Sequence, residues 1–211
     1  MAICNSHIGD LQWIQASLPV REGGLGIRCV SSLTLSAFLV SAASTSELQI
    51  LILLNCPSGV DNTVHEAWVR WCSINNRSCP VDECSARQRS WDAPGITRNW
   101  TTIWNDSVNN LDKARLLAFK AAHSSDWLFA HPISFCGLRM CDETIRVAFG
   151  LHLGLNLCKA RNCPCDELMS NQGIHGLSCK RRAGRSSRHH QVDNLISWAL
   201  KRCDVPATKE P

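Results

Sequence analysis

Three cysteines and one histidine lie close together late in this chain, at spacings that suit a small metal site. They are Cys163, Cys165, His175 and Cys179. Pro164 stiffens the turn of the C-x-C pair, and Gly173 and Gly176 allow the chain to fold back so that the second pair meets the first. Tetrahedral Zn²⁺ takes four thiolate or imidazole ligands, so the spacing predicts a zinc site. A C-x-C pair is less usual than C-x-x-C, and Cys158 is an alternative for one ligand.

Such a site would be structural, because protein side chains would fill all four coordination positions and leave none for an activated water. The ligands bind in their deprotonated forms, so zinc affinity should fall in acid. The alternative is a thiol-rich loop that binds no metal.

A cluster of basic residues follows the last of these cysteines directly. It comprises Lys180, Arg181, Arg182, Arg185, Arg188 and His189. The chain as a whole is only mildly basic, with a net charge of +4, so any acidic partner would be recognised through this local cluster. Guanidinium groups held beside a rigid zinc module can bind a phosphate backbone, which predicts DNA or RNA as the partner. The alternative is a solvated charged loop.

Helical periodicity dominates the rest of the chain, and alternating strand patterns are scarce. Apolar positions recur at helical spacing over residues 31–54, 63–73, 109–123, 142–155 and 188–203. The fold class is therefore mainly α: an irregular helical domain with a small zinc-knuckle-like module and a C-terminal helix. We expect the tryptophans along these helices to be core anchors.

Composition divides the chain into five expected parts. They are a helical region at 1–72, an irregular linker rich in proline, cysteine and arginine at 73–107, a helical region at 108–157, the zinc-knuckle-like module with its basic residues at 158–187, and a C-terminal helix at 188–211.

Thirteen cysteines would suggest disulfides in a secreted chain. The first residues show no basic stretch followed by an apolar one, so we expect no signal peptide, free thiols and an intracellular location, in the nucleus or cytoplasm. The apolar segment 33–54 is interrupted by polar residues, and we expect a buried helix rather than a membrane span.

The glycine-rich stretch at 18–28 lacks the residues that a phosphate-binding loop requires, and a close-packed turn is the better interpretation. We find no catalytic triad, paired metal-binding carboxylates or cysteine with a base partner. No small-molecule substrate is indicated.

Several blocks, in the same order, resemble the C-terminal part of reverse-transcriptase-like proteins of non-LTR retroelements. The blocks are LPVREGGLGIR, QRSWDAP, GLRMCDETIRVAFGLHLGLNLC, CPC…GIHGLSC and AGRSSRHHQVDNLISWAL. In that family a CCHC zinc knuckle follows the polymerase domain and leads into a restriction-like endonuclease. The resemblance implies that the four clustered residues are knuckle ligands and that Arg185, Arg188 and His189 match an R-x-x-R-H element. Asp166 departs from the glycine that the family often has after the second cysteine.

The resemblance further implies that residues 1–72 are a post-polymerase, thumb-like or connection-like region and that 188–211 opens a truncated endonuclease. Both catalytic centres of the family would then lie outside this chain, and we expect no activity from it alone. The expected function is nucleic-acid binding by a retroelement reverse-transcriptase fragment, with the polymerase and nuclease parts as further partners. The alternative is a zinc-stabilised helical module that binds a protein.

Overall fold

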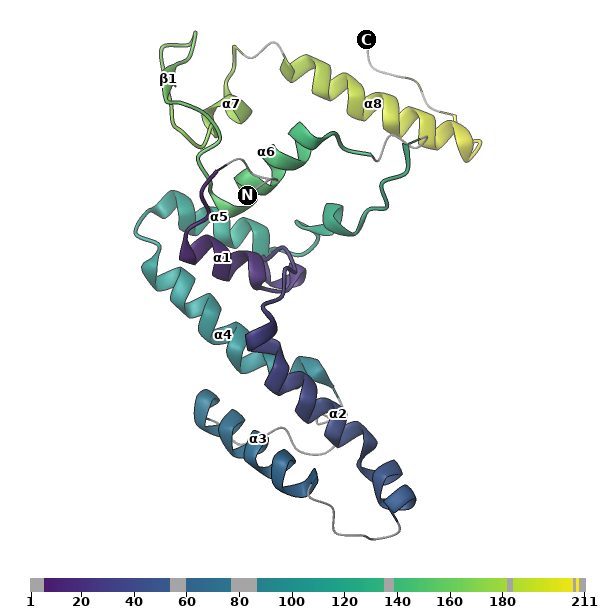
Figure 1. Ribbon diagram of the computed structural model, residues 1–211. Coiled ribbons are helices and arrows are strands. Elements are labelled where there is room, and N and C mark those ends of the chain that lie inside the picture. The colour runs from purple at the N-terminus through teal and green to yellow at the C-terminus, as the bar shows by residue number, and fades with distance from the viewer. Residues whose placement is uncertain are drawn as a thin grey trace. The chain divides into compact units, whose positions relative to one another are not determined.

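A computed structural model describes residues 6–53, 60–76, 87–134, 139–181, 184–206 and 208 of this chain. For residues 53, 60, 61 and 184–189 it describes the backbone but not the side chains. The described chain is mainly helical, as the sequence predicts, and divides into two compact units, Met1–Gly154 and Leu155–Pro211 (Figure 1). The first unit spans the parts expected over 1–72 and 73–107 and residues 108–154 of the third part.

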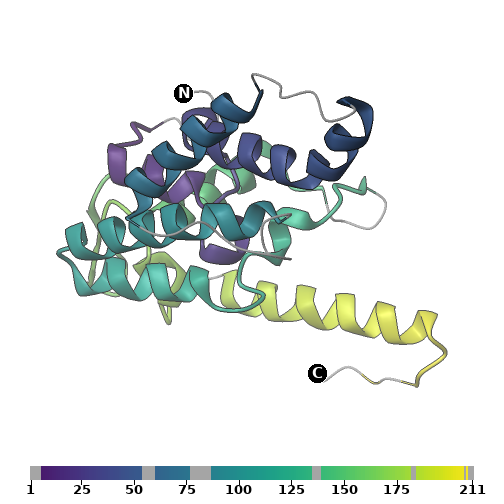
Figure 2. The ribbon, with the colours of Figure 1, turned by 90° about the horizontal axis from the view of Figure 1, so that it is seen from below.

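The first unit is built from helices alone in the residues that the structure describes. They are α1 (Asp10–Ser17), the short 3₁₀ helix η1 (Val20–Glu22), α2 (Val30–Leu53), α3 (Val60–Asn75), α4 (Gln88–Asp106), α5 (Asn110–Lys120), the 3₁₀ helix η3 (Asp126–Phe129) and α6 (Asp142–Leu153). Helix α2 packs against both α3 and α4, and α1 packs against α4 and α6. Figure 2 shows α4 and α5 side by side, where Ile103 and Leu116 share one apolar cluster.

Two apolar clusters hold this unit together. The first contains Leu18, Ile103 and Leu116, and Trp100 and Trp104 pack against it. The second contains Leu39 of α2, Trp71 of α3 and Trp91 of α4. The rings of Trp71 and Trp91 meet edge to face, with their centroids 5.0 Å apart. Large aromatic rings bury much apolar area, and these two join α2, α3 and α4 at one point. Trp68 and Trp198, by contrast, are exposed.

Residues 88–106 correct the prediction of an irregular linker over 73–107. They form α4, with Pro94 inside the helix. Ile96, Trp100, Ile103 and Trp104 have helical spacing and pack against the first apolar cluster. The polar and proline-containing start of the segment obscures this pattern in the sequence.

Helix α2 is also less buried than the sequence predicts. Val30–Ile52 is the one described helix long and apolar enough to cross a membrane. Only 11% of the 18-residue apolar stretch that meets this criterion is buried. Leu35, Leu39 and Val40 contact the second apolar cluster, whereas Leu48, Leu51 and Ile52, nearer the end, are exposed. The expectation of a buried helix is therefore wrong for the second half of α2.

The glycine-rich stretch forms the close-packed turn that the sequence predicts. The backbone N–H of Gly24 donates to the carbonyl of Pro19, and that of Gly26 donates to Leu18. A Cβ atom at Gly24 would clash with the Leu18 carbonyl, so the turn has no room for any other residue there. The turn is thereby held against the end of α1.

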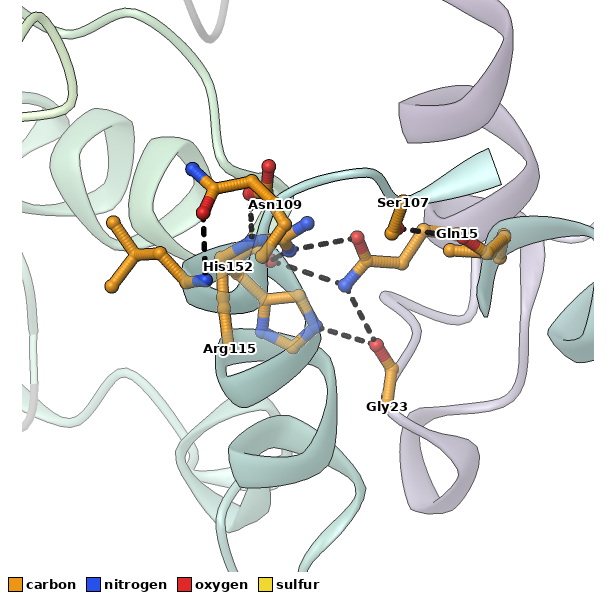
Figure 3. Close-up of polar contacts among 9 residues, drawn as sticks. Gln15, Gly23, Ser107, Asn109, Arg115 and His152 are labelled. Carbon is orange, nitrogen blue, oxygen red and sulfur yellow. Dashed lines mark hydrogen bonds and ion pairs between the residues drawn. The ribbon is translucent and has the colours of Figure 1, made fainter. Parts of the chain in front are cut away.

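A buried polar cluster ties this turn to α5 and α6 (Figure 3). The Gln15 amide and the Nε2 atom of His152 both form hydrogen bonds with the carbonyl of Gly23, at 3.2 and 2.9 Å. Arg115 of α5 donates to Oε1 of Gln15 at 2.9 Å and to the His152 carbonyl. Gly154 ends α6 with φ of 69°, and a Cβ there would lie 2.8 Å from the Arg115 Nε atom. The guanidinium therefore fits against the end of α6.

His152 should make the first unit sensitive to acid. Its side chain is fully buried, and its pKa lies below the usual value, first because burial disfavours the charged ring and also because of the Arg115 charge. The unfolded chain then takes up a proton near pH 6.5 that the folded chain resists, so stability is complete above that pH and falls below it. We expect the free energy of unfolding to drop by up to about 1.4 kcal/mol per pH unit in this range from His152.

Urea unfolding at pH 8 and pH 5.5, followed by tryptophan fluorescence, measures this loss. The His152→Gln variant should lose less stability than the wild type between the two pH values. Equal losses in the two proteins would contradict the assignment.

Candidate metal centre

The second unit begins with a small hairpin that carries the C-x-C pair. Strands β1 (Arg161–Asn162) and β2 (Leu168–Met169) pair antiparallel, with Asn162 opposite Leu168. In the turn between them, the Cys163 N–H donates to the Glu167 carbonyl at 2.9 Å, and the Asp166 N–H donates to the Cys163 carbonyl at 2.9 Å. Asp166 has φ of 69°, the left-handed conformation that glycine adopts most easily. Aspartate therefore occupies the turn without opening it.

The second pair of predicted ligands, His175 and Cys179, lies on a single helical turn after the hairpin. Gly173 has φ of 70° and reverses the chain, and α7 (His175–Ser178) follows. The Cys179 N–H donates to the His175 carbonyl at 2.9 Å, so the two ligands lie on the same side of this turn. The local backbone alone thus brings the histidine and the third cysteine to the hairpin.

The four predicted ligands meet in one group. The Sγ atoms of Cys163, Cys165 and Cys179 and a ring nitrogen of His175 all lie within 4.8 Å of one another. The Cys163 and Cys179 sulfurs are 3.5 Å apart, and those of Cys165 and Cys179 are 3.7 Å apart. A tetrahedral ion with metal–sulfur bonds of about 2.3 Å would set its sulfurs about 3.8 Å apart, whereas a disulfide requires about 2.05 Å. The group could therefore hold a metal ion.

Cys158, the alternative ligand, lies outside this group. Its thiol faces the carbonyls of Ser170 and Asn171, at 3.5 and 3.4 Å. The N–H groups of Leu157 and Cys158 also donate to the Asn171 carbonyl. These bonds close the base of the module and explain the position of this cysteine.

Glu167 is a site residue that the sequence patterns do not indicate. Its carboxylate lies 2.8 Å from Nδ1 of His175, while Nε2 of the same ring lies 3.1 Å from the Cys165 sulfur. A carboxylate that accepts from Nδ1–H fixes the tautomer in which Nε2 can bind a metal. The sequence does place Glu167 two residues after Cys165. This spacing does not single it out, because many exposed glutamates lie near a histidine without orienting it.

Replacing Glu167 by glutamine should weaken metal binding by about tenfold to a hundredfold, because the neutral amide supports the ring less well. Competition with a chelating dye measures this change. The exposed Glu47, in the other unit, supplies the control Glu47→Gln, which should bind metal like the wild type. Unchanged affinity in Glu167→Gln would show that the carboxylate does not position the ligand.

The basic cluster is described only at its beginning. Lys180 and Arg181 are exposed, and Nη1 of Arg181 donates to the Pro164 carbonyl at 2.7 Å. Arg182 lies outside the described residues. Arg185, Arg188 and His189 lie on the backbone of α8 (Gly184–Arg202), but their side chains are outside the described part.

The unit offers little apolar core to stabilise the module. Among its described residues, the buried apolar side chains are Leu155, Met169 and Cys179. The apolar side chains of α8 that the sequence places on one face include Val192, Leu195 and Ile196, and these are exposed. Modules with so small a core are usually stabilised by a metal or by disulfides.

Comparison with protein-family models, with curated proteins and with solved structures finds no match to this chain.

Proposed function

We propose that this chain is a nucleic-acid-binding segment in which a structural zinc ion orders a small module and thereby positions a basic cluster for DNA or RNA. The observation that carries the proposal is the meeting of three thiols and one imidazole within 4.8 Å, directly before Lys180 and Arg181. The order of the sequence blocks supports a further step. They resemble the region after the polymerase domain in non-LTR retroelement reverse transcriptases, and we infer the same origin for this chain.

The donor set favours zinc over other common ions. Thiolate and imidazole are soft or borderline ligands, whereas Mg²⁺ and Ca²⁺ prefer oxygen. A set of three cysteines and one histidine is typical of structural zinc sites. With four protein ligands, such an ion stabilises the fold and leaves no position for an activated water, so we assign no catalytic role to the site.

The contact of Arg181 with Pro164 supports coupling between the metal and the basic cluster. Pro164 lies between two of the ligands, and its carbonyl accepts from the Arg181 guanidinium. Lys180 follows a third ligand, Cys179, directly. An ion bound by Cys163, Cys165 and Cys179 would therefore hold both Pro164 and the backbone before Arg181 in place. The preorganised cluster would lose less conformational entropy when it binds a phosphate backbone.

Replacing Arg181, Arg182 and Arg185 by glutamine should reduce the salt dependence of nucleic-acid binding. Each phosphate that a side chain no longer neutralises lowers the slope of log affinity against log salt by about 0.7 to 0.9, so the slope should fall by roughly two. Filter binding to single-stranded and double-stranded DNA and RNA at several salt concentrations measures it. Chelation of the metal should also weaken binding.

A charge-matched control removes three cations from the first unit: Lys113→Gln, Arg139→Gln and Arg146→Gln together. This control variant should keep a steeper slope than the basic-cluster variant. The proposal would be contradicted if the basic-cluster variant had the same slope of log affinity against log salt as the wild type. Full nucleic-acid affinity after chelation would also contradict it.

A second candidate function rests on the exposed apolar side chains of α8. Val192, Leu195, Ile196 and Trp198 are each about half exposed, as on a helix that docks on another protein. In this alternative, the zinc-stabilised module binds a protein, for example the polymerase part of the same polyprotein. Partner binding that persists at high salt, without nucleic acid, would favour it.

A further inference from the structure

Two adjoining hollows lie in the first unit. The larger, of about 440 Å³, lies among the start of α2, the end of α3 and α4. The smaller, of about 350 Å³, lies among the glycine-rich turn, α4 and η3. Arg28, Asp92 and Ile96 line both hollows, so these residues form a shared wall between them.

Arginine dominates the charge of these hollows. The charged residues that line them are Arg21, Arg28, Arg70, Arg89, Arg98 and Asp92. Asp92 is largely buried and already accepts from Arg28 at 2.8 Å. The remaining four arginines therefore face no carboxylate among the described lining residues. Such a concentration of positive charge on a concave surface attracts anions strongly.

Two of the arginines are oriented by contacts within the unit. Arg28 is held by Asp92, and Nη1 of Arg98 donates to the Ile74 carbonyl at 2.8 Å, near the end of α3. Each contact uses only part of a guanidinium, which has five N–H donors. Arg21, Arg70 and Arg89 are exposed at the rims.

Hydroxyl groups at the start of α2 complete the larger hollow. Ser31, Ser32 and Thr34 line it beside Arg28 and Arg70. Guanidinium and hydroxyl groups are among the side-chain donors that contact phosphate oxygens of nucleic acids. A single small anion would meet only some of these arginines, whereas successive phosphates of a strand can meet arginines in both hollows.

We propose that these two arginine-lined hollows bind the phosphate backbone of a nucleic-acid strand, as a second contact that does not require the metal. The inference goes beyond the proposed function, because it places a binding site in the helical first unit. It predicts nucleic-acid affinity that survives chelation.

The test replaces Arg21, Arg70 and Arg89 by glutamine together in the full chain and leaves Arg28 and Arg98, which have contacts within the unit, unchanged. The slope of log affinity for a labelled strand against log salt should fall by about 0.7 to 0.9 for each phosphate that is no longer neutralised. After chelation, the wild type should retain strand binding that this variant lacks. The control variant at Lys113, Arg139 and Arg146 should retain it too. An unchanged slope in the Arg21, Arg70 and Arg89 variant, or an equal loss in the control, would overturn the proposal.

A second measurement uses the wild-type chain, so it does not depend on whether the variant folds. Phenylglyoxal labels accessible arginines, and mass spectrometry locates the label. A bound strand should protect Arg21, Arg70 and Arg89 more than Arg139. Protection by a mononucleotide or by polyglutamate at the same concentration of anionic groups would instead identify a general anion site and overturn the assignment to a strand.

Discussion

Replacing Cys179 by serine is expected to abolish zinc binding and to unfold residues 157–181. Cys179 is the buried member of the ligand group, and the module has few other apolar side chains to stabilise it. Binding of structural zinc contributes about 10 to 16 kcal/mol in small zinc modules. The loss of one of three thiolates removes much of this free energy. The few buried apolar side chains of the module cannot compensate for the loss.

Amide hydrogen exchange read by mass spectrometry measures the effect segment by segment. Peptides from residues 157–181 should exchange at the rate of an unfolded chain in Cys179→Ser, while those from α4 and α5 keep their protection. Cys158→Ser is the matched control, because this thiol lies outside the group of four and hydrogen-bonds backbone carbonyls. It should keep both the metal and the protection. Protection of 157–181 in metal-free Cys179→Ser would show that the module folds without an ion.

Replacing Arg115 by methionine should destabilise the first unit by about 2 to 4 kcal/mol. The side chain is largely buried, and its guanidinium bonds Gln15, the His152 carbonyl and Asp112. Methionine removes the donor to the acceptors on Gln15 and His152, which are buried residues, and a buried acceptor that loses its partner costs about 1 to 3 kcal/mol. Burial also lowers the pKa of Arg115, although arginine stays charged at neutral pH.

Arg146→Met provides the control for this prediction. Arg146 also pairs with a carboxylate three residues away, Glu143, but on the surface. Exposed pairs of this kind contribute about 0 to 1 kcal/mol. Urea unfolding should therefore separate the two variants clearly. A loss below about 1 kcal/mol in Arg115→Met would mean that the buried cluster does not hold the turn to α5 and α6.

Local patterns in the sequence were sufficient to predict that Cys163, Cys165, His175 and Cys179 meet. These four residues lie within one short segment, and tight turns at Asp166 and Gly173 bring them together without help from distant residues. The helices with continuous apolar periodicity, such as α2 and α6, were predictable for the same reason. Glu167 was not, because its role depends on the orientation of one imidazole ring.

Features that depend on distant residues could not be predicted. Gln15 donates to the carbonyl of His152, 137 positions away, and nothing near either residue in the sequence indicates this contact. The helix α4 was missed because its proline and its polar start hide the apolar positions that pack on α1 and α5. The arginines of the two hollows are scattered from Arg21 to Arg98 and form a cluster only when the helices pack.

Metal content and X-ray absorption at the zinc edge, measured on one purified sample, test whether the group of three cysteines and one histidine holds zinc. We predict one zinc per chain, with three sulfurs at about 2.3 Å and one nitrogen at about 2.0 Å. A sample that folds with no stoichiometric zinc, or a zinc ion surrounded by oxygen ligands, would contradict this prediction.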